Sequence, residues 1–181
     1  MHGVIFTSLR HFATARLGAE TAVELWRGEP AYLITGSYDD GAFLRLFARV
    51  AEEAGVGEAV LLRDFGVFAA GTTFGLLYPS FFDQAASARE FMLHVEERIH
   101  EVVRSTLPDS RPPALRVVPH GDDGVHITYD SPRRLCALLV GLAIGATRRF
   151  GERVHVEETA CMHDGAPACE FELTFAPARP D

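Results

Sequence analysis

The segment Tyr129-Asp130-Ser131-Pro132-Arg133 marks the point at which the chain changes from extended to helical structure. Apolar residues alternate with polar ones in the stretch that leads into it: Val125, Ile127 and Tyr129. Apolar residues recur at helical spacing in the stretch that follows: Leu135, Leu138, Leu139 and Leu142. Serine followed by proline suits a helix start, with Ser131 as the N-cap and Pro132 in the first turn. The segment therefore predicts a strand followed directly by a helix that continues to about Phe150.

Upstream of this segment, residues 1–107 have the apolar spacing of helices. Two apolar stripes carry this signal: Phe43, Leu46, Phe47 and Val50 in the first, and Val60, Leu61, Phe65 and Phe68 in the second. A third helix is expected over residues 85–106, with one apolar face: Met92, Val95, Ile99, Val102 and Val103. The proline-rich stretch 108–113 is the strongest break in composition and is expected to separate two subdomains.

Downstream, the strands of an antiparallel sheet are expected, ending in a hairpin with arms at residues 154–158 and 169–175. The chain is therefore predicted to have an α+β fold in a single domain over residues 1–181. A mainly helical subdomain, residues 1–107, is followed by a sheet with one long packed helix, residues 112–175.

Composition narrows the class of protein. The 181 residues are 48% hydrophobic, which suits one well-buried core. The formal net charge of −8 has the wrong sign for binding a phosphate backbone, so nucleic acid is not expected as a partner. The N-terminus lacks the pattern of a secretory signal. The longest apolar run, 136–146, is far shorter than the roughly 20 residues that span a bilayer, so a cytoplasmic protein without a membrane segment is expected.

Donor groups gather at the change from strand to helix. Tyr129 and Ser131 carry hydroxyls, and Arg133 carries a guanidinium that can bind carboxylates or phosphates in a bidentate manner. A helix that begins here would add free backbone N–H groups and the positive end of its dipole. The segment indicates an anion site, although an ordinary helix cap with a surface arginine would have the same sequence.

Two histidines lie on the helix expected over residues 85–106. At 100° per residue, His94 falls opposite the apolar face, whereas His100 falls at its edge and can point inward. An inward histidine is more often a core residue than a ligand. Imidazole is nevertheless the usual axial ligand of a noncovalently held heme, and no Cys-x-x-Cys-His attachment motif is present.

Taken together, these motifs resemble the heme nitric oxide/oxygen binding (H-NOX) family. That family includes the heme domain of soluble guanylate cyclase and stand-alone bacterial sensors. The resemblance runs from Met1 to about Phe175, and its most specific motif is Tyr-x-Ser-x-Arg. The other matching segments are Met1-His2-Gly3-Val4-Ile5-Phe6, Leu62-Arg63-Asp64-Phe65-Gly66, and the helix leading to His100 with Pro112-Pro113 after it.

The resemblance implies one b-type heme between the two subdomains, with His100 on the iron. The donors Tyr129, Ser131 and Arg133 would hold the heme propionates, and Ile5 and Pro113 would lie against the macrocycle. One departure from many relatives is an alanine at position 22, where an aromatic residue is expected.

The resemblance also bears on ligand choice. Oxygen-binding relatives are expected to carry a distal tyrosine at the position of Leu138, and Leu9 replaces another polar-edged aromatic. Bound oxygen needs a hydrogen-bond donor that nitric oxide needs less. The sequence therefore predicts binding of nitric oxide and carbon monoxide, with no stable oxygen complex and with release of His100 on nitric oxide binding.

The three cysteines, Cys136, Cys161 and Cys169, fall in the region of a zinc site found in some bacterial relatives. Glu158 stands where those relatives have a histidine ligand. Other ways to fill the fourth position are His155 and His163. Buried free thiols or a reversible disulfide are the alternatives to zinc.

A gas-binding regulatory domain without catalytic activity is the leading interpretation. Its signalling partner in this family is typically a histidine kinase or a cyclic-di-GMP enzyme. The alternative is a thiol or zinc redox sensor on the same fold. A thiol hydrolase built on Cys161 or Cys169 with His163 is disfavoured, because no third orienting group or oxyanion-hole motif accompanies them.

Overall fold

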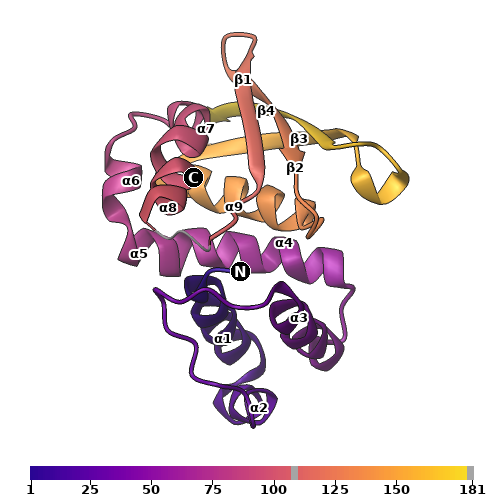
Figure 1. Ribbon diagram of the computed structural model, residues 1–181. Helices are drawn as coiled ribbons and strands as arrows, with labels where there is room; N and C mark the ends of the chain where they lie inside the picture. The colour runs from indigo at the N-terminus through magenta and orange to yellow at the C-terminus, as the bar shows by residue number, and fades with distance from the viewer. Residues whose placement is uncertain (107–109, 179–181) are drawn as a thin grey trace.

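The computed structural model describes residues 1–106 and 110–178, so Pro108 of the predicted proline break lies outside the described residues. A helical half and a sheet-bearing half lie one above the other (Figure 1). The helical half contains the following elements: α1 (Gly3–Leu17), α2 (Ala19–Leu25), α3 (Asp40–Ala54) and α4 (Glu58–Ala69). Local signals set their ends: the Asp39 side chain accepts from Ala42 N at the start of α3, and Gly55 ends that helix in the left-handed conformation.

A chain of short helical elements then runs along the side of the protein (Figure 1): the π-helix η1 (Ala70–Phe74), α5 (Gly75–Leu77), α6 (Pro79–Asp83), α7 (Ala88–Val95), the π-helix η2 (Glu96–His100) and α8 (Glu101–Thr106). The last three form the helix expected over residues 85–106, with a π-turn in its middle. The side chain of Ser87 caps its start by accepting from Glu90 N. The prediction that Val102 lies on the apolar face of this helix is wrong, because Val102 is 42% exposed.

The predicted α+β fold is confirmed by a four-stranded antiparallel sheet with the order β1-β2-β4-β3. Its strands are β1 (Ala114–His120), β2 (Gly124–Asp130), β3 (Glu152–Ala160) and β4 (Cys169–Pro177), and the short 3-10 helix η3 (Met162–Asp164) joins the last two. The expected hairpin is confirmed, with arms longer than predicted. The residues predicted to alternate inward on β2, Val125, Ile127 and Tyr129, are buried.

The long helix α9 (Cys136–Arg149) lies between the sheet and α4 (Figure 1). Glycines let the backbones of α4 and α9 touch: a Cβ atom on Gly141 would lie 2.1 Å from the carbonyl oxygen of Arg63, and one on Gly66 would lie 2.6 Å from that of Leu138. This close crossing joins the two halves of the protein.

The predicted start of this helix at Ser131 and Pro132 is wrong, because α9 begins at Cys136. A turn intervenes, in which Arg134 N–H donates to Ser131 O at 3.0 Å and Arg134 adopts a φ of 51°. The N–H of Leu135 is taken by the hydroxyl of Tyr129 at 3.1 Å. These contacts hold the backbone outside the helix for several residues, so Tyr129 lies at the end of β2, and Ser131 and Arg133 lie on a turn rather than on a helix end.

Two hydrophobic cores fill the two halves. The helical-side core contains side chains of α1, α3 and α4, and the sheet-side core contains those of the strands, α6 and α7. Helix α9 contributes to both, and Phe74 packs against both. Helices α6 and α7 precede the proline-rich stretch in the sequence, but their side chains belong to the sheet-side core. The predicted division of the single domain into subdomains 1–107 and 112–175 stays a prediction.

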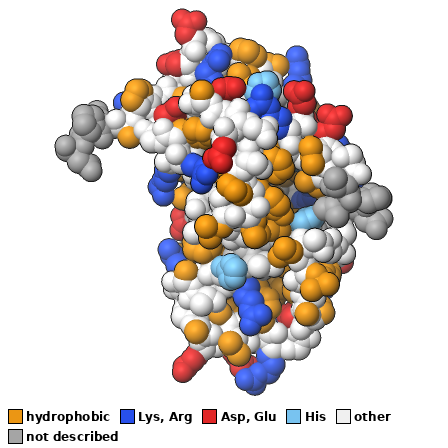
Figure 2. Space-filling view, turned by 90° about the vertical axis from the view of Figure 1, so that its left-hand side faces the viewer, with side chains coloured by type: hydrophobic (Ala, Val, Ile, Leu, Met, Phe, Trp, Pro, Cys, Tyr) orange, Lys and Arg blue, Asp and Glu red, His pale blue; other side chains and the backbone are white. Residues whose placement is uncertain are grey.

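Among the described residues, one helical stretch, Glu58–Leu77, is long and apolar enough to cross a membrane, and 44% of its apolar window is buried within the protein. This stretch includes α4, the packing partner of α9, which accounts for much of its apolar character. The C-terminal end of this stretch is exposed to solvent, with Leu76 and Leu77 of α5 at 80% and 44% exposure. The face that carries α5 shows hydrophobic side chains scattered among charged ones (Figure 2).

Candidate functional site

The imidazole of His100 lies at the end of the π-turn η2, with only 16% of its side chain exposed. π-Turns inside α-helices are frequent at functional sites. The Nδ1 atom of His100 lies 2.8 Å from a carboxylate oxygen of Glu96. Within the described part of the chain, Nε2 of His100 has no hydrogen-bond partner. Burial lowers the pKa of His100 and the Glu96 carboxylate opposes this only in part, so the ring is neutral at pH 7 and Nε2 is available as a metal ligand.

His94 occupies a different environment on the same helix. Its side chain is 36% exposed, and its Nδ1 lies 3.6 Å from the carboxylate of Glu97, which is 75% exposed. The predicted difference between an inward His100 and a more solvated His94 is therefore visible in their burial.

The motif residues Tyr129 and Ser131 are almost completely buried, at 3% and 2% exposure. Burial raises the pKa of Tyr129, so its phenol remains protonated and keeps a proton to donate. The hydroxyl of Ser131 accepts from Arg133 N at 3.4 Å. Both hydroxyls thus line the turn that positions Arg133.

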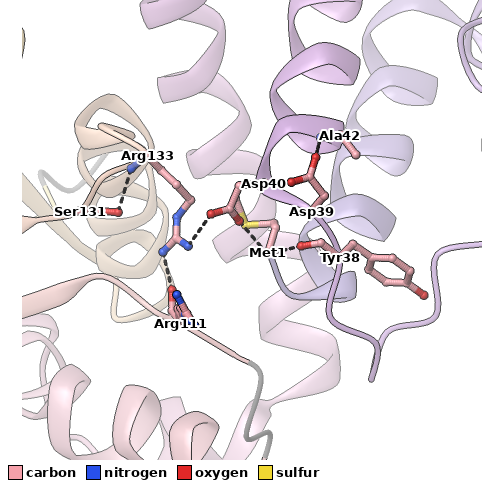
Figure 3. Close-up of polar contacts among 8 residues, drawn as sticks. All are labelled: Met1, Tyr38, Asp39, Asp40, Ala42, Arg111, Ser131 and Arg133. Atoms are coloured by element: carbon pink, nitrogen blue, oxygen red, sulfur yellow. Dashed lines mark hydrogen bonds and ion pairs between the residues drawn. The ribbon is translucent and has the colours of Figure 1, made fainter.

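The guanidinium of Arg133 reaches across to the helical half of the protein (Figure 3). Its Nη1 lies 3.3 Å from a carboxylate oxygen of Asp40, and its Nη2 donates to the carbonyl of Arg111 at 2.6 Å. The other Asp40 oxygen lies 2.7 Å from the Met1 ammonium, which also donates to Tyr38 O. Although burial alone would raise the pKa of Asp40, these two cations hold it below its usual value. Asp40 therefore stays ionised beside Arg133.

The predicted apolar residues fall mainly in one place. Leu9 and Leu138 are buried in the helical-side core, and Ile5 packs against that core. Pro113 is half-buried in the segment that precedes β1. Ile5 and Leu9 lie on α1, and Leu138 lies on α9, so the two helices present apolar side chains to the same core.

These residues fit a heme by the chemistry of their donors. A neutral, buried imidazole with a free Nε2 suits the iron, a buried arginine with two hydroxyls suits the propionates, and an apolar group suits the macrocycle. His100 and Arg133 are both largely buried, and a neighbouring carboxylate orients each side chain. Glu96 contacts His100, and Asp40 contacts Arg133.

The three thiols come together as a second cluster. The Sγ of Cys161 lies 4.0 Å from that of Cys136 and 3.9 Å from that of Cys169, and all three cysteines are free. A carboxylate oxygen of Glu158 completes a group whose ligand atoms all lie within 4.8 Å of one another. Zinc in a tetrahedral thiolate site places its sulfurs about 3.8 Å apart, given Zn–S bonds of about 2.3 Å. The spacing of the thiols is therefore suited to a zinc ion.

The other expected fourth ligands point elsewhere. His155 lies on β3 opposite Thr174, and Nε2 of His163 bonds to the carbonyl of Arg134 at 3.0 Å. Burial, and then the neighbouring thiols, raise the pKa of Cys136 to about 12, so its thiol is protonated at neutral pH when no metal is present.

Two residues of the site were not singled out from the sequence. Glu96 precedes His100 by four residues, a spacing at which helical side chains meet. The contact between Glu96 and His100 could therefore have been predicted from the sequence. Asp40 lies 93 residues from Arg133 in the sequence, and no local signal pairs them.

The family model for haem-NO-binding proteins matches residues 2–158, so the chain belongs to the haem-NO-binding, or H-NOX, family of heme-based gas-sensor domains. No curated protein matches the sequence at a significant level. Among solved structures, the H-NOX protein of S. oneidensis in the Fe(II)NO state is similar over 97% of this chain and 99% of its own, with 22% identity and a TM-score of 0.90. The NMR structure of an H-NOX domain from Shewanella oneidensis in the Fe(II)CO state is similar over 100% of both chains, with 23% identity and a TM-score of 0.86. The unliganded Fe(II) H-NOX protein of K. algicida covers 100% of both chains with 19% identity and a TM-score of 0.86.

Proposed function

We propose that the chain is a heme-based nitric oxide sensor in which Nε2 of His100 is the axial ligand. The observation that carries this proposal is the buried, neutral imidazole of His100, oriented through Nδ1 and free at Nε2, in a chain of the haem-NO-binding family. When bound, the heme would supply a ferrous iron that can bind nitric oxide or carbon monoxide, and His100 would hold that iron through Nε2. Tyr129, Ser131 and Arg133 would donate hydrogen bonds to the propionates.

The apolar group supports nitric oxide over oxygen as the physiological ligand. Ile5, Leu9 and Leu138 carry no hydrogen-bond donor, and bound oxygen requires one in an apolar pocket. The buried hydroxyls of Ser8 and Thr73 bond to each other at 2.9 Å. We therefore propose that the protein binds nitric oxide and carbon monoxide and forms no stable oxygen complex. Pro113 and Ile5 would lie against the macrocycle.

Release of His100 from the iron would be the signal. His100 lies on η2, which is continuous with α7 and α8, and α7 packs on β1 and β2. A helix freed from the iron can relax against the sheet, and a ligand acts through its different affinity for the two states. We propose that a partner, a histidine kinase or a cyclic-di-GMP enzyme, reads this change, and that the chain acts in the cytoplasm without catalysis of its own.

The thiol cluster is proposed to bind one zinc ion through Cys136, Cys161, Cys169 and Glu158. These ligands would join the start of α9 to β3 and β4, so the metal would stabilise the sheet-side half. A thiol redox sensor is the second candidate, and the same 3.9 Å and 4.0 Å distances between thiols support it when no metal is bound, because oxidation can join neighbouring thiols in a disulfide. A colourless protein whose thiol count falls under peroxide would support that alternative.

Replacing His100 tests the proposed function. We expect His100→Ala to lose heme, or to bind it only when imidazole is added, because the axial ligand is gone. His94→Ala is the matched control on the same helix and should keep the wild-type absorption spectrum. Equal heme loss in both variants would contradict the assignment of His100.

A further inference from the structure

Three side chains on one helix form a short chain of contacts around His100. The Nδ1 atom of His100 is 2.8 Å from Oε2 of Glu96, and Nη2 of Arg104 is 2.5 Å from Oε1 of the same carboxylate. Glu96 is only 30% exposed, whereas Arg104 is 43% exposed. The carboxylate therefore lies between the imidazole and a more solvated cation.

The direction of the hydrogen bond follows from the charge of Glu96. A guanidinium stays charged and carries only N–H donors, so Arg104 at Oε1 pairs with Glu96 as an ionised carboxylate, which is an acceptor. The proton between the two residues must then belong to Nδ1 of His100. A neutral imidazole carries one ring proton, so its Nε2 holds a lone pair.

We propose that Glu96 is the positioning residue of the site: it fixes the Nδ1–H tautomer of His100 and strengthens the bond from Nε2 to the heme iron, while Arg104 weakens this effect by sharing the carboxylate charge. This inference rests on the proposed function of His100 as axial ligand. A carboxylate behind a ligating histidine raises the basicity of the ligand. Glu96 and Arg104 together would set how readily nitric oxide displaces His100.

The chain offers a matched control for this proposal. Glu97 neighbours Glu96 on the same π-turn, but its carboxylate faces His94 at 3.6 Å. Glu97→Gln removes the same charge from the same helix and does not touch His100. A merely structural role for the Glu96–Arg104 pair would change stability and leave the iron–histidine bond as it is.

The first measurement uses resonance Raman spectra of the reduced heme-loaded protein. Glu96→Gln should lower the iron–histidine stretching frequency and speed heme loss about 10-fold, the low end for losing such a partner. Arg104→Met should shift the frequency upward, and Glu97→Gln should leave it unchanged. The same frequency in the Glu96 and Glu97 variants would overturn the proposal, and so would a downward shift in Arg104→Met.

The second measurement needs no heme and separates this inference from the proposed function. Nitrogen-15 NMR of the heme-free protein should show His100 as the Nδ1–H tautomer, and Glu96→Gln should give a mixture of both tautomers. A wild-type His100 protonated at Nε2 would overturn the role of Glu96. Failure of the wild-type protein to bind heme would instead overturn the proposed function, while the tautomer result would still decide whether Glu96 fixes the protonation of the His100 ring.

Discussion

Replacing Asp40 by asparagine should loosen the link between the two halves of the protein. Asp40 begins α3 in the helical half, and its carboxylate lies 3.3 Å from the guanidinium of Arg133, which follows β2 (Figure 3). Asparagine has nearly the same shape but no charge, so the substitution removes the ion pair with little change in packing.

The magnitude follows from burial. A hydrogen bond between charged groups contributes about 1.5–3 kcal/mol when buried, and an exposed pair contributes about 0–1 kcal/mol. The side chain of Arg133 is 9% exposed and that of Asp40 is 37% exposed, so the pair lies between these limits. We expect a coupling free energy of about 1 kcal/mol, which corresponds to roughly 2–4 °C in the unfolding midpoint of a domain of this size.

The coupling should also depend on pH in a definite direction. The pKa of Asp40 is lowered in the folded protein, so its stabilising contribution is present above the unfolded value, about 4, and is lost as the pH falls through the folded value. The assay is a double-mutant cycle of Asp40→Asn and Arg133→Met, followed by urea unfolding of the heme-free protein at pH 7 and at about pH 3.

A matched control lies next to Asp40. Asp39→Asn removes the same charge, and asparagine caps a helix as well as aspartate does, so α3 should keep its start and no coupling to Arg133 should appear. A coupling below about 0.3 kcal/mol at pH 7, within the error of additivity, would refute the reasoning. A coupling as large at pH 3 as at pH 7 would refute it equally.

Two further predictions concern the cofactors. Tyr129→Phe and Arg133→Met should each speed heme transfer to an acceptor globin, because each removes a proposed donor to the propionates, and an unchanged rate in the double variant would remove that role. Metal analysis of protein purified under reducing conditions should find about one zinc per chain. Cys169→Ala and Cys161→Ala should each lose this zinc and lower the temperature of the unfolding midpoint. Wild-type protein that contains no zinc would contradict the proposed metal site.

The sequence predicted the parts of the fold that depend on periodicity. The alternation at Val125 and Ile127 identified β2, and the helical spacing after Leu135 identified α9. The start of α9 was predicted too early, because the hydroxyl of Tyr129 captures the N–H of Leu135, a contact between a strand and a turn that spacing alone does not show. Propensity favoured a cap at Ser131, and tertiary contacts decided otherwise.

The candidate site was predictable where its residues are close in the sequence and unpredictable where they are far apart. The inward phase of His100 followed from the 100° helical rotation, and the contact with Glu96 has the ordinary spacing of four residues. The partner of Arg133 is Asp40 on α3, and the two residues meet through tertiary packing, to which the crossing of α4 and α9 contributes. The fourth member of the thiol cluster was open in the sequence, since the reach of Glu158 depends on the fold of the β3–β4 hairpin.

His100 is proposed to bind the heme iron and to leave it when nitric oxide binds. The most direct test is the absorption spectrum of the reduced, heme-loaded protein with nitric oxide at physiological temperature, beside the same protein in air. We expect a five-coordinate ferrous nitrosyl spectrum with nitric oxide and no persistent oxygen complex in air, because Leu9 and Leu138 offer no hydrogen-bond donor. A nitrosyl complex that stays six-coordinate, or a stable oxygen spectrum in air, would contradict it.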